Sequence, residues 1–107
     1  MAHENETIMQ VLANYVNDVK NIFSIEKVYL YGSYAKGLAN EYSDIDVCFF
    51  LSTFGSKRSV DIVTELLTIA GKYSDYYIEP RAFPFTEIEN NNPFVKEVLR
   101  TGYEVLL

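Results

Sequence analysis

Two aspartates and a glycine–serine pair carry the clearest chemistry in this sequence. Asp44 and Asp46 are one residue apart, and they follow Gly32 and Ser33 after a spacer of ten residues, 34–43. In a strand, residues i and i+2 project to the same face, so the two carboxylates would lie side by side. Paired oxygen ligands suit Mg²⁺, which proteins commonly hold with one or two carboxylates and substrate phosphates. The pattern indicates a metal-dependent nucleotide site.

The turn before the aspartates is the candidate phosphate site. Gly32 would let the backbone approach a phosphate closely, and Ser33 offers a hydroxyl and a backbone N–H. Lys36 follows in the same turn, where its ammonium could neutralise charge on a phosphate. The alternative is an ordinary exposed lysine. In this interpretation the carboxylates hold the metal and the turn holds the triphosphate.

Hydrophobic periodicity predicts alternating helices and strands that would position these residues. A short helical turn and a loop are expected over 34–43, and loops over 52–58 and 87–92. The predicted helices and strands are, in chain order, helix Thr7–Phe23, strand Lys27–Tyr31, strand Asp44–Leu51, helix 59–71, strand Tyr76–Phe83, helix 93–101 and strand Tyr103–Leu107.

Several residues are expected to bound or orient these elements. Ser59 is predicted to cap the second helix and Gly71 to end it. Pro80 cannot donate to a sheet ladder, so the third strand should bend there or lie at a sheet edge. The predicted buried stripes are Ile8, Leu12, Tyr15, Val19 and Ile22 in the first helix and Val63, Leu66, Leu67 and Ala70 in the second. In the second strand, Ile45, Val47, Phe49 and Leu51 should share one face, with Asp44, Asp46, Cys48 and Phe50 on the other.

Composition limits the class of protein. With 107 residues, of which 49% are hydrophobic and 15% aromatic, we expect one packed domain over residues 1–107. The net charge of −6 argues against an extended nucleic-acid footprint, which needs clustered Lys and Arg. No apolar run reaches the roughly 18 residues of a membrane span, and a signal peptide is lacking. Cys48 is the single cysteine, so a reducing cytoplasm is the expected location.

The spacing Gly32-Ser33, ten residues, Asp44, one residue, Asp46 resembles the signature of minimal nucleotidyltransferases of the DNA polymerase beta superfamily. The resemblance implies an α+β fold with α/β-like alternation, in which helices pack on a small mixed sheet. It also implies two divalent ions, Mg²⁺ or Mn²⁺, held by the two aspartates and a third acidic residue. The best candidate for the third is Glu79, where the family more often has aspartate. The alternative for Glu79 is a solvated strand carboxylate.

The same resemblance implies an activity. Small stand-alone members of the family often form the antitoxin half of a toxin–antitoxin pair with a HEPN-domain RNase, and they transfer AMP from ATP to a toxin tyrosine. We therefore expect a nucleotidyltransferase that uses ATP, or another nucleoside triphosphate, and a HEPN-type protein acceptor, with Asp44, Asp46 and Glu79 catalytic. A non-catalytic binding module and transfer to a small-molecule hydroxyl are the alternatives. For Arg81 we expect an ion pair with a carboxylate rather than a substrate contact.

Overall fold

A computed structural model describes residues 5–40 and 43–107 of the chain. All predicted helices and strands are present, with shifts of a few residues at their ends. Two short 3₁₀ turns, over Gly71–Tyr73 and Phe85–Glu89, add to them, and the second replaces the start of the predicted loop 87–92. The elements are α1 (Asn5–Lys20), β1 (Ile25–Tyr31), β2 (Ile45–Leu51), α2 (Ser59–Ala70), β3 (Ile78–Pro84), α3 (Pro93–Thr101) and β4 (Tyr103–Val105).

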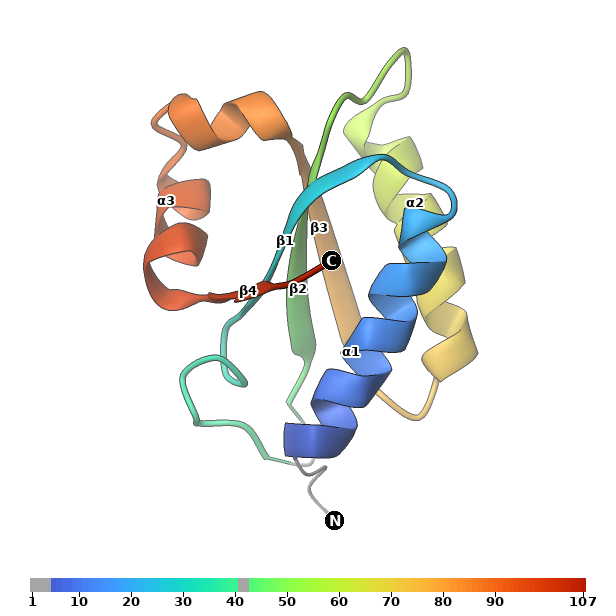
Figure 1. The fold of residues 1–107 in the computed structure, drawn as a ribbon, viewed down its shortest axis with the longest axis vertical. Helices are drawn as coiled ribbons and strands as arrows, with labels where there is room; N and C mark the ends of the chain where they lie inside the picture. Colours follow the sequence, from blue (N-terminus) through green and yellow to red (C-terminus); the bar gives the residue numbers. More distant parts are fainter. Residues whose placement is uncertain (1–4, 41–42) are drawn as a thin grey trace.

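The strands form one mixed sheet in the order β3-β2-β1-β4. β1 is antiparallel to both of its neighbours, whereas β2 and β3 are parallel and are joined through α2, because parallel neighbours need a crossover. Helices α1 and α2 lie on one face of the sheet and α3 on the other (Figure 1). The α+β fold with a small mixed sheet is confirmed.

The larger core lies between the sheet and the pair α1 and α2. The predicted residues of α1 from Ile8 to Val19 are buried, and the Tyr15 hydroxyl donates to the Leu66 carbonyl of α2 at 2.8 Å. Ile22 was predicted in the same stripe but is 58% exposed, because α1 ends at Lys20 and the helical spacing no longer applies. None of the helices in the described ranges has the length and hydrophobicity of a membrane-spanning segment.

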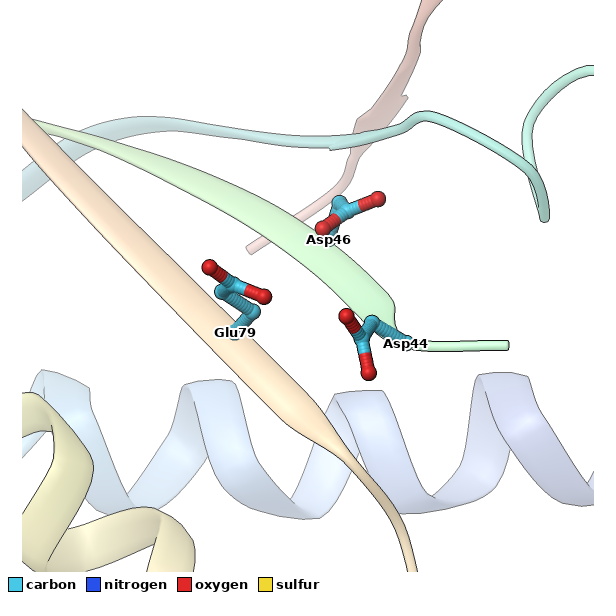
Figure 2. Close-up of side chains that lie close together, drawn as sticks. All are labelled: Asp44, Asp46 and Glu79. Carbon is cyan, nitrogen blue, oxygen red and sulfur yellow. The ribbon is translucent and has the colours of Figure 1, made fainter. Parts of the chain in front are cut away.

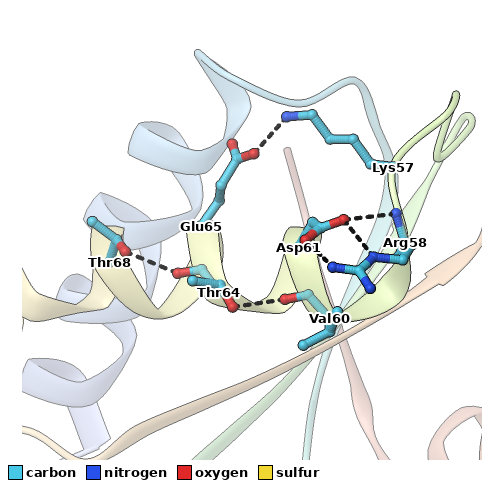
Figure 3. A network of polar contacts seen from close by, with 7 residues as sticks. All are labelled: Lys57, Arg58, Val60, Asp61, Thr64, Glu65 and Thr68. Atoms are coloured by element: carbon cyan, nitrogen blue, oxygen red, sulfur yellow. Dashed lines mark hydrogen bonds and ion pairs between the residues drawn. The ribbon is translucent and has the colours of Figure 1, made fainter.

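The ends of α2 differ from the prediction. Arg58, not Ser59, is the N-cap residue, and the Asp61 carboxylate accepts its backbone N–H at 3.2 Å (Figure 3). Asp61 therefore satisfies a donor at the helix start, as the acidic partner of a capping box does. Gly71 keeps a right-handed conformation, with φ −58°, and the chain continues into the 3₁₀ turn. The α-helix therefore ends at Gly71, as predicted, but without the left-handed conformation that is typical of a glycine cap.

The buried face of α2 is rotated from the predicted one. Ile62, Leu66 and Ala70, spaced four residues apart, point into the core, whereas Leu67 is 50% exposed. The prediction of a stripe through Leu67 was wrong because two apolar stripes overlap on this helix and periodicity alone does not rank them.

The two faces of β2 follow the prediction. Its residues from Ile45 to Leu51 at odd positions pack in the core with α1 and α2, while Cys48 and Phe50 pack against Val95 and Val98 of α3. The strand is therefore apolar on both faces except at Asp46, which places a carboxylate on the second face. One face of the sheet thus carries both a small core and the acidic residues.

β3 is an edge strand, as Pro80 predicted. The Tyr77 carbonyl accepts from the Ile45 N–H of β2 at 2.6 Å, and backbone groups alternate in direction along a strand. The backbone N–H and C=O groups of residues 78, 80, 82 and 84 therefore face away from β2. Because Pro80 and Pro84 lack an N–H, both missing donors fall at the free edge of the sheet, where no ladder bond is lost.

Candidate active site

Strand register brings the three predicted acidic residues together. Asp46 of β2 pairs with Tyr31 at the end of β1 and with Glu79 of β3, and Asp44 precedes β2 at the same end of the sheet. One carboxylate oxygen from each of Asp44, Asp46 and Glu79 lies within 4.8 Å of the others, and Figure 2 shows all three side chains beside the start of β2. Parity along the strand had placed Glu79 only on a face; the parallel register with β2 places it next to Asp46.

The cluster is electrostatically unfavourable without a cation. Burial, together with the neighbouring carboxylates of Glu79 and Asp44, raises the pKa of Asp46 to about 6, while Arg81 opposes the rise. Asp46 is partly buried, and the other two carboxylates are exposed. Three anions share one site, so a bound cation would favour the ionised form of each.

A divalent ion with oxygen ligands fits this donor set. Mg²⁺ stands about 2.0–2.1 Å from each ligand oxygen, so oxygens on opposite sides of one ion are about 4.2 Å apart. The three carboxylate oxygens lie within 4.8 Å of one another, which is close to that span. The open side of the cluster leaves room for substrate oxygens, which Mg²⁺ sites in nucleotide enzymes commonly use.

Gly32 has a second role that the sequence did not reveal. It adopts the left-handed conformation, with φ +72°, and a Cβ at this position would stand 2.2 Å from Oδ2 of Asp46. A side chain would therefore be strained and would displace the carboxylate. The glycine allows the turn to lie directly against Asp46, so the proposed phosphate turn and the acidic cluster form one site.

The turn after Gly32 is held by its own backbone. The Lys36 N–H donates to the Gly32 carbonyl at 3.1 Å, and the Leu38 N–H donates to the Ser33 carbonyl at 2.9 Å. A turn followed by a loop was expected within 34–43; the turn spans 32–37, starting two residues earlier, and residues 41–42 of the loop lie outside the described residues. Ser33, directly after Gly32, is half-buried, and Lys36 is exposed.

Arg81 lies on the same face as Glu79 but not where an ion pair would put it. Its guanidinium stands 4.9 Å from the centre of the Phe94 ring, and in the described part of the chain no carboxylate is within 4.0 Å of it. The predicted ion pair was wrong, because the Arg81 guanidinium lies over the Phe94 ring of α3 instead. Arg81 still acts on Asp46 at longer range by lowering its pKa.

Tyr31 is the neighbour of Asp46 that sequence reasoning missed. Burial and the Asp46 charge raise the pKa of its hydroxyl to about 12, and its ring meets Phe94 edge-on at 5.5 Å. It therefore stays neutral at physiological pH, although Arg81 opposes the rise in its pKa. The antiparallel register of β1 with β2, which sequence periodicity does not specify, is what places it there.

Residues 12–102 match the protein family described as "Nucleotidyltransferase domain", and the chain belongs to this family. It is therefore an enzyme of the nucleotidyltransferase class. Two proteins of Methanocaldococcus jannaschii are similar to it. "Putative protein adenylyltransferase MJ1305" is 29% identical over 96% of this chain and 74% of the relative, and "Putative protein adenylyltransferase MJ0141" is 28% identical over 92% and 98%.

Solved structures share the fold. The crystal structure of a toxin–antitoxin with AMP-PNP matches with a TM-score of 0.63 and 18% identity over 90% of this chain and 70% of the other. A mutant of the toxin–antitoxin MntA-HpeT matches with a TM-score of 0.63 and 19% identity, over 97% and 73%. A Sulfolobus solfataricus protein, described as a "putative nucleotidyltransferase", matches with a TM-score of 0.62 and 19% identity, over 92% and 86%.

Proposed function

We propose that this chain transfers AMP from ATP to a tyrosine hydroxyl of a partner protein, and that the partner is a HEPN-type toxin for which the chain is the antitoxin. The observation that carries the proposal is the meeting of Asp44, Asp46 and Glu79 beside the Gly32–Ser33 turn. Relatives named as protein adenylyltransferases, and toxin–antitoxin structures of the same fold, support the acceptor class. The HEPN partner rests on the motif resemblance.

Each residue of the site has a separate task in this proposal. The three carboxylates would hold two Mg²⁺ ions, or Mn²⁺, which when bound supply the positive charge that activates the attacking oxygen and offsets charge on the phosphates. The Gly32–Ser33 backbone and the Ser33 hydroxyl would bind the outer phosphates, with the Lys36 ammonium at the rim.

The proposed reaction is an in-line displacement at the α-phosphorus of ATP. The tyrosine oxygen forms a bond to the α-phosphorus, and the bond from that phosphorus to its bridging oxygen breaks. The electron pair leaves with pyrophosphate, and the hydroxyl proton is released to solvent. A tyrosine hydroxyl ionises near pH 10, which makes it easier to deprotonate than an alkyl alcohol.

One experiment tests the proposal directly. The purified chain is incubated with labelled ATP, Mg²⁺ and the protein encoded beside it, and intact-protein mass spectrometry looks for an added AMP group. AMP on a partner tyrosine supports the proposal. Neutralisation of the partner with no added mass would instead favour the non-catalytic binding module, and transfer to a small hydroxyl compound alone would favour the third hypothesis.

Metal dependence has its own measurement. Mg²⁺ with ATP should raise the melting temperature of the chain, because a ligand that binds only the folded state stabilises it. EDTA should abolish the rise. An equal rise from ATP in EDTA would contradict the assignment of the carboxylates as metal ligands.

A further inference from the structure

A groove runs from the acidic cluster along the outer edge of the sheet. It has a volume of about 490 Å³ and lies between the C-terminal half of α2 and the start of β3. Val63 and Leu67 line it from α2, Tyr76 and Tyr77 line it before β3, and Asp44 and Glu79 of the acidic cluster also line it. The groove is therefore continuous with the candidate active site.

We infer that this groove receives the acceptor segment of the partner protein, a tyrosine flanked by basic residues. The inference rests on the proposed function, since it names the side from which the acceptor enters. The occupant is a polypeptide, and its hydroxyl would point towards Asp44 and Glu79.

The direction of the reaction supports this placement. In an in-line displacement the attacking oxygen enters opposite the leaving group. The proposed phosphate turn follows β1 and lies against Asp46 on that side, so pyrophosphate leaves towards β1. In the strand order β3-β2-β1, the opposite side of Asp46 is β3, where Glu79 and the groove lie.

Exposure of apolar side chains in the groove supports a polypeptide occupant. Leu67 is 50% exposed and Tyr77 is 57% exposed. Leu67 is the residue that periodicity assigned to the core, so its apolar side chain is not explained by folding. Apolar side chains that gather at a polar site are typical of interaction surfaces.

Charge in the groove selects between occupants. Of the side chains that line its described part, only Asp44 and Glu79 carry a formal charge at neutral pH, and both are negative. A phosphate-bearing ligand would be repelled along this route, whereas lysine or arginine beside the acceptor tyrosine would be attracted. The net charge of −6 on the chain acts in the same direction.

Backbone chemistry excludes one common way of binding a peptide here. Strand addition needs donors and acceptors along a free edge, but Pro80 and Pro84 remove two N–H groups from the outer edge of β3. We therefore expect the partner to bind mainly through side chains, and a tyrosine suits an apolar groove that also holds polar groups.

The test uses the full chain, Mg²⁺, labelled ATP and two synthetic peptides that contain one tyrosine, flanked either by two lysines or by two glutamates on each side. We expect kcat/KM for AMP transfer to the lysine peptide to be at least about tenfold higher. Leu67→Lys should lower that value by at least about tenfold and leave the thermal shift with Mg²⁺ and ATP unchanged. Leu67→Ala, which adds no charge, should lower it less.

Val60→Lys is the matched control. Val60 lies in the first turn of α2 (Figure 3), is 58% exposed and is outside the groove. It should change kcat/KM by less than about twofold, because its charge is not at the acceptor route.

Three results would overturn the inference. Equal labelling of the two peptides would remove the charge selection. An effect of Val60→Lys as large as that of Leu67→Lys would show that the groove is not the acceptor site. A loss of ATP binding in Leu67→Lys would assign the groove to the nucleotide. If AMP is transferred to a partner protein and the transfer is insensitive to these substitutions, only this inference fails. If no acceptor of any kind gains AMP, the proposed function fails as well.

Discussion

One face of β2 has two halves that differ sharply. Cys48 and Phe50 are completely buried beneath α3, whereas at the other end of the same face Asp46 is only partly buried and Asp44, just before the strand, is exposed. Val95 and Val98 of helix α3 pack on Cys48 and Phe50, so the helix buries the apolar half of this face. The difference between the halves is therefore a difference in cover rather than in strand geometry.

Burial has opposite consequences in the two halves. The Cys48 thiol has a pKa raised to about 12 by burial, so it stays neutral and packs as a small apolar group. Burial also raises the pKa of Asp46, but at neutral pH that carboxylate is largely ionised, and its charge is poorly solvated and repelled by its neighbours. The closed half stabilises the fold, while the open half holds charge that favours binding of a cation.

The largest expected effect is on the closed half. Phe50→Ala should lower the free energy of unfolding by about 3–5 kcal/mol, because it leaves a cavity among aromatic neighbours such as Phe83 and Tyr29. Urea denaturation measures the change. Leu38→Ala, at a position 73% exposed, is the control and should change stability by less than about 0.5 kcal/mol. A decrease in the free energy of unfolding of less than about 1 kcal/mol in Phe50→Ala would show that α3 does not pack tightly over this half of the face.

The next effect separates activity from stability in the open half. Asp46→Asn should lower the rate of AMP transfer more than about 100-fold, or about 2.7 kcal/mol of barrier, because the amide keeps the shape but not the anionic ligand. The circular dichroism spectrum and cooperative melting should be retained. Asp75→Asn, at an exposed position outside the cluster, should keep full activity. Wild-type transfer by Asp46→Asn would refute the proposed role.

Glu79 tests how far the open half extends towards β3. Glu79→Gln should slow transfer by at least about tenfold, about 1.4 kcal/mol, with partner binding nearly unchanged. Single-turnover rates and a separate binding titration measure the two quantities. Either an unchanged rate or a protein that no longer folds would argue against a role for Glu79 in the chemistry.

The smallest effect is the pH dependence of stability in EDTA. The folded pKa of Asp46, about 6, is above the ordinary value of 3.8, so folding favours the protonated form. Stability should rise as pH falls from 7.5 to 5, where the folded state takes up a proton that the unfolded state does not. Because Asp46 is partly exposed, solvent screening reduces the gain to about 1 kcal/mol.

Asp46→Asn serves as the control for this pH series. Urea midpoints of the variant should change less between pH 7.5 and 5, and the variant should be the more stable protein at pH 7.5 in EDTA. Parallel pH profiles for the two proteins would show that another group carries the dependence.

Sequence patterns predicted the faces of elements better than their surroundings. Alternation in β2 was sufficient for both of its faces, because residues i and i+2 share a face wherever the strand lies. The same reasoning failed for Leu67 and Ile22, since burial depends on where a helix ends and which neighbour it meets. The contact of Gly32 with Asp46, and the groove beside β3, depend on register and packing between distant segments, which a single-sequence pattern does not contain.

The two prolines of β3 also bear on how this chain behaves at high concentration. An exposed sheet edge can recruit the edge of another copy and begin a chain of hydrogen-bonded sheets that ends in aggregates or fibres. On the β3 side, Pro80 and Pro84 interrupt the row of donors that such growth needs. On the opposite side, β4 has only three residues, Tyr103–Val105. Both edges of the four-stranded sheet are therefore poor templates for pairing with another copy of the chain.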